Sequence, residues 1–173
     1  ASALVMVVDA TDVVVELDSN FAKMVEEVGG RATFYVLTDI VPKSADVLKK
    51  IQARGHEIAY LGDRYEGFKD QSSAVQAKRF DAMRKVTNDA GVNVPADAGF
   101  HAPLESYDKT TENLLSERNF RYMLTSNGAT DSRLPFFATN AVPANASRPL
   151  VVLPRTQIGP EDAMEEGDPE VGL

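Results

Sequence analysis

Residues 32–61 constrain the fold most strongly, because they have the pattern of a strand, a helix and a second strand. Residues 32–37, ATFYVL, are mostly apolar, β-branched or aromatic, which favours a buried strand. Val47, Leu48 and Ile51 then repeat at helical spacing, with Ser44 expected as the N-cap and Gly55 as the residue that ends the helix. Residues 57–61, EIAYL, predict the next strand. Such a unit is typical of α/β proteins.

The rest of the chain repeats this alternation. Short apolar runs predict further strands at residues 3–8, 97–102, 120–125 and 149–153, with helical stripes between them. Residues 126–149 are irregular and predict a long loop or lid. The acidic segment after Pro154 is expected to be a solvated end. We therefore predict one α/β domain over residues 1–173 with a parallel sheet.

Composition excludes several classes of function. The formal net charge is −8, which argues against a nucleic-acid partner because no basic surface is available to neutralise phosphates. The chain has no cysteine, so disulfides, thiolate metal sites and cysteine nucleophiles are excluded. No apolar run is long enough to predict a transmembrane segment.

The central unit also carries a family resemblance. ATFYVL at residues 32–37 and GHEI at residues 55–58 resemble the signature of the polysaccharide deacetylases, the NodB-homology domain of carbohydrate esterase family four. The resemblance extends from residue 5 to about residue 125 and is most specific at GHEI. It implies a distorted or incomplete (β/α) barrel with its site at the carboxyl ends of the strands. Those ends are expected to supply Asp9, Thr38, Leu61, His101 and Thr125.

The resemblance implies that the family's metal ligands are missing. The family's first motif, Thr-Phe-Asp-Asp, aligns with residues 7–10, so Asp9 keeps the position of the base and Ala10 replaces a metal-binding carboxylate. Asp12 is close enough in sequence to be considered as a substitute. The two histidines of His-x-x-x-His fall on Leu61 and Tyr65. A methyl group and an aliphatic side chain cannot bind a metal, and a phenol is a poor ligand. We expect no bound metal and no other cofactor, and a structural role for His56.

The family's third motif, Arg-x-Pro-Tyr-Gly, aligns with residues 101–105. Pro103 is kept, while His101 replaces the arginine and Leu104 replaces the tyrosine. The family's later catalytic histidine has no counterpart, because no histidine follows Thr125. Asp9 and His101 are therefore the residual catalytic candidates.

Three hypotheses follow from these substitutions. The favoured one is a catalytically inactive domain that binds a carbohydrate or a protein partner at the cell envelope, an extracytoplasmic location implied only by the resemblance. Its candidate binding residues, all expected at one strand-end face, are Asp9, Asp12, Leu61, Tyr65, Phe68, His101 and Leu104. The first alternative is a working N- or O-deacetylase with a non-standard site built from Asp9, Asp12 and His101. The second is a structural or regulatory module without a ligand, in which the apolar residues of the barrel mouth simply extend the core.

Overall fold

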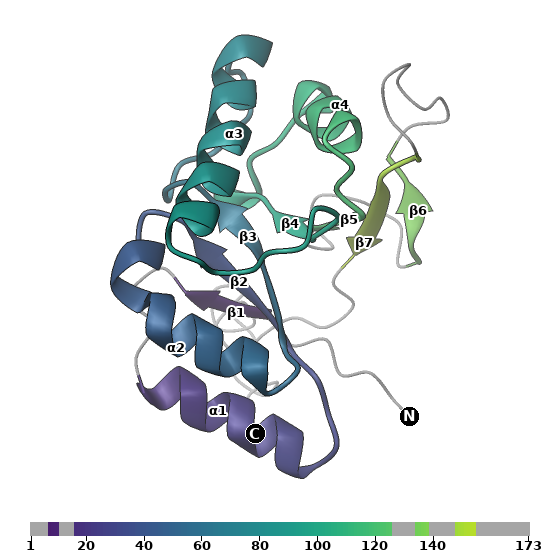
Figure 1. The fold of residues 1–173 in the computed structure, drawn as a ribbon. Coiled ribbons are helices and arrows are strands. Elements are labelled where there is room, and N and C mark those ends of the chain that lie inside the picture. The colour runs from purple at the N-terminus through teal and green to yellow at the C-terminus, as the bar shows by residue number, and fades with distance from the viewer. Residues whose placement is uncertain (1–6, 11–15, 126–133, 139–147, 155–173) are drawn as a thin grey trace, which may run out of the picture.

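The structure, a computed structural model, describes residues 7–10, 16–125, 134–138 and 148–154. Within this part of the chain the strands form one seven-stranded sheet in the order β1-β2-β3-β4-β5-β7-β6 (Figure 1). The strands are β1 (Val7–Ala10), β2 (Thr33–Leu37), β3 (Glu57–Gly62), β4 (Phe100–His101), β5 (Tyr122–Thr125), β6 (Phe136–Phe137) and β7 (Val151–Pro154).

The sheet is parallel from β1 to β7, which confirms the predicted α/β class. Among the described strands, β6 is the one that pairs antiparallel, with β7. β1 and β6 end the strand order and do not pair with each other, so the barrel is not closed in the described chain. β6 lies inside the stretch expected to be a loop, and the sequence analysis missed it. The predicted strand at residues 3–8 is observed from Val7, and residues 3–6 lie outside the described residues.

Four α-helices of the described chain alternate with these strands: α1 (Glu16–Glu27), α2 (Val41–Ala53), α3 (Ser73–Asp89) and α4 (Lys109–Glu117). Successive helices contact each other, α1 against α2, α2 against α3 and α3 against α4 (Figure 1). A 3₁₀ turn, η1 (Pro103–Glu105), follows β4. No helix in the described part of the chain is both long and apolar enough to cross a membrane.

The start of α2 corrects the sequence prediction. The helix begins at Val41, with Ile40 at the N-cap position, and Ser44 is a buried residue inside it. Pro42 lies in the first turn, where its missing N–H is not needed. The end of the helix is as predicted, because Gly55 follows it with a φ of 85°, a left-handed conformation that glycine adopts without strain.

Alternating side chains of the strands form the core on two faces of the sheet. Phe34, Val36 and Ile58 pack in one cluster with Leu48 and Ile51 of α2. A second, aromatic cluster lies beneath α3 and α4 and includes Phe68, Phe80, Phe100 and Phe120. The opposite face of the sheet carries a third cluster, formed by Tyr35, Leu37, Ala59, Leu61 and Leu124.

His56 has the structural role that the sequence predicts. Its Nδ1 accepts a hydrogen bond from the Ala32 N–H at 3.1 Å, and its Nε2 lies 2.8 Å from the Ala22 carbonyl oxygen. The side chain is buried and both ring nitrogens are engaged. His56 therefore ties α1 to the start of β2.

Candidate functional site

The first candidate residues lie at the end of β1. Asp9 pairs in register with Tyr35 of β2, and Ala10 pairs with Val36. Ala10, at the position of a family metal ligand, offers no donor atom. Asp12 lies outside the described residues.

The end of β3 offers no metal ligand of the family type either. Leu61 is 2% exposed and packs in the cluster with Tyr35 and Leu124, so it does not reach a ligand. Tyr65 is 57% exposed. Within the described residues, no three His, Cys, Asp or Glu side chains group closely enough to hold a metal ion. The donor atoms at these positions therefore do not fit the zinc-type site of the family.

The loop that carries Tyr65 is organised by Arg79 of α3. The guanidinium group is buried and donates hydrogen bonds to Asp63 Oδ1 at 2.8 Å, the Gly67 carbonyl oxygen at 2.6 Å and the Glu66 carbonyl oxygen at 2.8 Å. A buried arginine with this many acceptors holds the loop backbone in one conformation.

Phe68 lies beneath this arginine, not at the surface. Its ring centroid is 3.8 Å from the Arg79 guanidinium carbon and 5.0 Å from the Phe80 ring centroid, in a stacked arrangement. The residue is fully buried. Phe68 thus belongs to the core, and its assignment as a binding residue is corrected.

His101, at the end of β4, forms a polar cluster that faces inward. Its Nε2 lies 2.8 Å from Glu105 Oε1, and the Thr125 hydroxyl donates to Glu105 Oε2 at 3.2 Å. The Tyr107 hydroxyl lies 3.3 Å from Thr125 Oγ1, and the edge of the His101 ring meets Tyr35 with centroids 5.8 Å apart. His101 is buried, Nδ1 included, and its Nε2 contact helps to hold the Glu105 carboxylate in place.

The sequence analysis did not identify Glu105, whose position depends on backbone geometry. Leu104 and Glu105 have φ values of 58° and 51°, a conformation that few side chains adopt. This turn brings the Glu105 carboxylate back to His101 and leaves Leu104 61% exposed. The spacing of four residues between His101 and Glu105 is visible in the sequence, but the left-handed turn that joins them is not.

The loops that follow β3 and β4 contact each other and form one surface, here called the carboxyl-end face. The Phe68 N–H donates to the Ser106 carbonyl oxygen at 2.7 Å, and Gly62 lies against the Pro103 ring. Tyr65 and Leu104 are the exposed apolar side chains of this face. Arg64 pairs with Glu66, and its hydrogen bond lowers the pKa of the Glu66 carboxyl, which keeps that carboxylate ionised. This arrangement can stack on and hydrogen-bond to a ligand.

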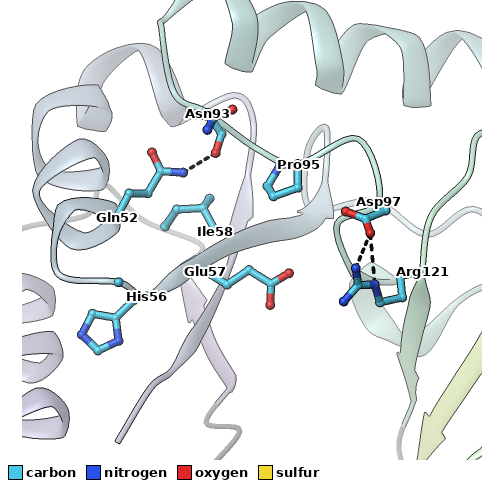
Figure 2. A pocket seen from close by; sticks show the side chains of 9 residues that line it. Gln52, His56, Glu57, Ile58, Asn93, Pro95, Asp97 and Arg121 are labelled. Atoms are coloured by element: carbon cyan, nitrogen blue, oxygen red, sulfur yellow. Dashed lines mark hydrogen bonds and ion pairs between the residues drawn. The ribbon is translucent and has the colours of Figure 1, made fainter. Parts of the chain in front are cut away.

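A cavity of about 410 Å³ lies at the opposite ends of the strands (Figure 2). It lies beside the start of β3 at Glu57 and is bordered by Gln52 of α2, Asn93 and Asp97 of the connection between α3 and β4, and Arg121 before β5. Amino ends of parallel strands share one edge of a sheet, so this cavity is separate from the carboxyl-end face.

Comparison with known proteins confirms the family. Residues 2–123 match the family model described as polysaccharide deacetylase. No curated protein matched the sequence.

Solved structures share the fold at low sequence identity. A Mycobacterium smegmatis protein named as a polysaccharide deacetylase is 24% identical, with a TM-score of 0.65 over 78% of this chain and 44% of that chain. The Puue allantoinase is 19% identical, with a TM-score of 0.62 over 80% of this chain and 44% of that chain. Wild-type BA3943 from Bacillus anthracis, a CE4 family pseudoenzyme, is 14% identical, with a TM-score of 0.59 over 69% of this chain and 42% of that chain.

This chain spans less than half the length of each of these three proteins. The family model nevertheless covers most of the 173 residues, from the first strand to the fifth. The chain therefore belongs to the polysaccharide deacetylase family.

Proposed function

We propose that this chain is a catalytically inactive polysaccharide-deacetylase-like domain that binds a glycan at its carboxyl-end face. The observation that carries the proposal is the chemistry of the three family ligand positions, which hold Ala10, Leu61 and Tyr65. Because Leu61 is buried in an apolar cluster, a metal at this position would meet hydrocarbon where the family supplies imidazole. Without the ion, the carbonyl group of an acetyl substituent is not polarised and no acidified water is available.

The exposed side chains support binding in place of hydrolysis. Tyr65 and Leu104 present an aromatic ring and an aliphatic side chain to solvent, on loops fixed by Arg79 and by the Phe68–Ser106 hydrogen bond. An amphipathic aromatic ring on a rigid loop suits the mixed apolar and hydroxyl faces of a sugar ring. The carboxylates of Asp63 and Glu66 beside Tyr65 are acceptors for hydroxyl groups.

The alternative of a working deacetylase with a non-standard site is less well supported. It requires His101 to act on a ligand together with Asp9 and Asp12. His101 is buried, and its Nε2 is held by Glu105. The similar fold of BA3943, described as a pseudoenzyme, supports an inactive member, and a BA3943 mutant is described as having restored enzymatic activity.

A protein partner is the second candidate ligand, because a separate apolar surface is exposed. Leu134 and Phe137 are 75% and 59% exposed, and Phe136 and Phe137 form the edge strand β6. Exposed apolar residues on a sheet edge are typical of protein-binding surfaces. We propose the cell envelope as the location for either ligand.

Titration with N-acetylglucosamine oligomers, followed by backbone amide shifts, tests glycan binding. We expect saturable shifts at Tyr65, Leu104 and Glu105 in the millimolar range. Tyr65→Ala should weaken binding about fivefold, which corresponds to about 1 kcal/mol for one aromatic contact. Phe137→Ala is the matched control, because it removes an exposed ring from the other surface.

Absence of shifts at the carboxyl-end face at millimolar oligomer would exclude the glycan. A partner protein would instead protect the amides of β6 from hydrogen exchange, and Phe137→Ala would then be the variant that weakens binding.

A further inference from the structure

The cavity at the amino ends of the strands has a carboxylate that is fixed before any ligand arrives. Glu57 begins β3, and its Oε2 accepts hydrogen bonds from the Thr33 hydroxyl at 2.8 Å and from the Tyr122 hydroxyl at 3.0 Å. Within the described chain Glu57 forms no ion pair. Both hydroxyl contacts use one oxygen, and Figure 2 shows the carboxylate directed toward the Asp97 and Arg121 side of the cavity.

Tyr122 fixes the position of the Glu57 carboxylate through its hydroxyl group. Burial raises the pKa of the Tyr122 hydroxyl, so it stays protonated and donates to Glu57. The ring lies so close to Gly99 that a Cβ there would come within 2.3 Å of a ring carbon. Glycine at this position therefore permits the close approach that places the hydroxyl, and the Glu57 carboxylate is pre-organised.

On the far side of the cavity, Asp97 forms ion pairs with two arginines. Asp97 Oδ2 accepts from Arg121 Nε at 3.1 Å, and Arg148 Nη2 lies 3.3 Å from the same oxygen. Of the residues that line the cavity, Glu57 and Asp97 carry two negative charges and Arg121 one positive charge, so the cavity has no excess of positive charge for an anion.

The remaining lining mixes amides with one apolar surface. Gln52 donates to the Asn93 carbonyl oxygen, which leaves the Gln52 side-chain oxygen as an acceptor beside the cavity (Figure 2). Asn93 and Pro95 are exposed at its rim, so the Asn93 amide and the Pro95 ring are accessible to a ligand.

We propose that this cavity binds one neutral sugar ring, as a second carbohydrate site that is independent of the carboxyl-end face. A hydroxyl group both donates and accepts, which matches a lining that alternates acceptors (Glu57, Asp97) with donors (Arg121, Asn93). An anion would face two carboxylates, and an apolar ligand would leave these polar groups desolvated without partners. The volume of about 410 Å³ falls within the range of small-molecule sites and is sufficient for one ring.

Titration of the intact chain with D-glucose and with monomeric N-acetylglucosamine, followed by amide shifts, tests this site. We expect saturable shifts at Glu57, Asn93 and Arg121 at millimolar sugar. Asn93→Ala removes one exposed hydrogen-bonding group and should weaken binding about fivefold. Glu57→Gln keeps an oxygen for Thr33 and Tyr122 but removes the charge, and should weaken binding about tenfold. Asn88→Ala, an equally exposed change on α3 outside the cavity, is the matched control and should leave binding unchanged.

Three results would overturn the proposal. The first is no saturable shift around the cavity at about 50 mM sugar, well above the millimolar range expected for a few hydrogen bonds. The second is binding that Asn93→Ala and Glu57→Gln leave unaltered while both variants remain folded. The third is tighter binding of inorganic phosphate than of glucose, which would make the cavity an anion site. None of these results depends on Tyr65 or Leu104, so they test the amino-end cavity independently of the proposed function.

Discussion

The two ends of the parallel strands differ in how they use their polar groups. At the carboxyl ends, His101, Glu105 and Thr125 hydrogen-bond to one another and His101 is buried, while the exposed side chains include Tyr65 and Leu104. At the amino ends, the polar groups of Glu57 and Asp97 border an open cavity. The usual division of a (β/α) barrel places function at the carboxyl ends and stability at the amino ends.

We propose that this difference follows from the residues at the family's metal-ligand positions. With Ala10 and Leu61 at two of these positions, the proposed site holds no ion, and His101, Glu105 and Thr125 hydrogen-bond to one another instead. In the proposed function, the exposed side chains of Tyr65 and Leu104 then contact a bound ligand. At the amino ends, the polar groups of Glu57, Asp97 and Arg121 line the open cavity.

The largest expected effect on the free energy of unfolding distinguishes a buried from an exposed aromatic residue in the loop that follows β3. Phe68→Ala should lower the free energy of unfolding by about 3–5 kcal/mol, because it empties a fully buried aromatic position beneath Arg79. Tyr65→Ala should change it by no more than about 0.5 kcal/mol, because that ring is exposed. Urea unfolding of both variants measures the difference. Equal losses for the two variants would contradict the assignment of Phe68 to the core and of Tyr65 to the surface.

A smaller loss of unfolding free energy is expected for a substitution at the amino ends of the strands. Gly99→Ala should lower the free energy of unfolding by about 1–3 kcal/mol, because the added methyl displaces the Tyr122 ring and its hydrogen bond to Glu57. In a Tyr122→Ala background the same methyl should cost nearly nothing. Thermal or urea unfolding of this double-mutant cycle measures the coupling. Additive losses would mean that Gly99 is required for a reason other than the approach of the Tyr122 ring.

The smallest effect concerns Asp97 and pH. The hydrogen bond from Arg121 is the main cause that lowers the pKa of the Asp97 carboxyl in the folded chain, followed in the same direction by that from Arg148. A lowered native pKa stabilises the fold above the pKa of the unfolded chain and loses that contribution as the pH falls through the native pKa. The pair is exposed, so its contribution should stay below about 1 kcal/mol.

Comparing the urea unfolding of Asp97→Asn and the wild-type chain at neutral and at acidic pH measures this contribution. The difference should be present at neutral pH, shrink in high salt and vanish once Asp97 is protonated. A difference that persists at acidic pH would show that charge is not its cause.

Much of the fold could be predicted because its signals are local. The buried apolar runs that became β2 and β3 and the helical stripe of α2 are set by periodicity within a few residues. The start of α2 was misplaced because serine is a typical N-cap residue and Ser44 was given that position, whereas Pro42 fits the first turn of the helix. β6 was missed because two residues carry no periodic signal, and only its pairing with β7 defines it as a strand.

The candidate site was less predictable because it depends on contacts distant in sequence. The sequence alignment with the family located Leu61 and His101, but it did not show that both are buried. Phe68 stands in a polar loop, and only the buried Arg79 from α3 explains why its ring turns into the core. Arg79 itself falls on the buried stripe of α3 with Phe80 and Met83, a pattern that could have indicated its role.

The zinc content of the purified chain after dialysis against a weak chelator directly tests whether the family's metal site is absent. We expect the wild-type chain to retain far less than one equivalent, because Ala10, Leu61 and Tyr65 supply no ligand set of the family type. The triple variant Ala10→Asp, Leu61→His and Tyr65→His, which restores the three ligand types, should retain about one equivalent, while each single variant should retain little. A wild-type chain that retains about one equivalent of zinc would contradict the claim that the family's metal site has been lost.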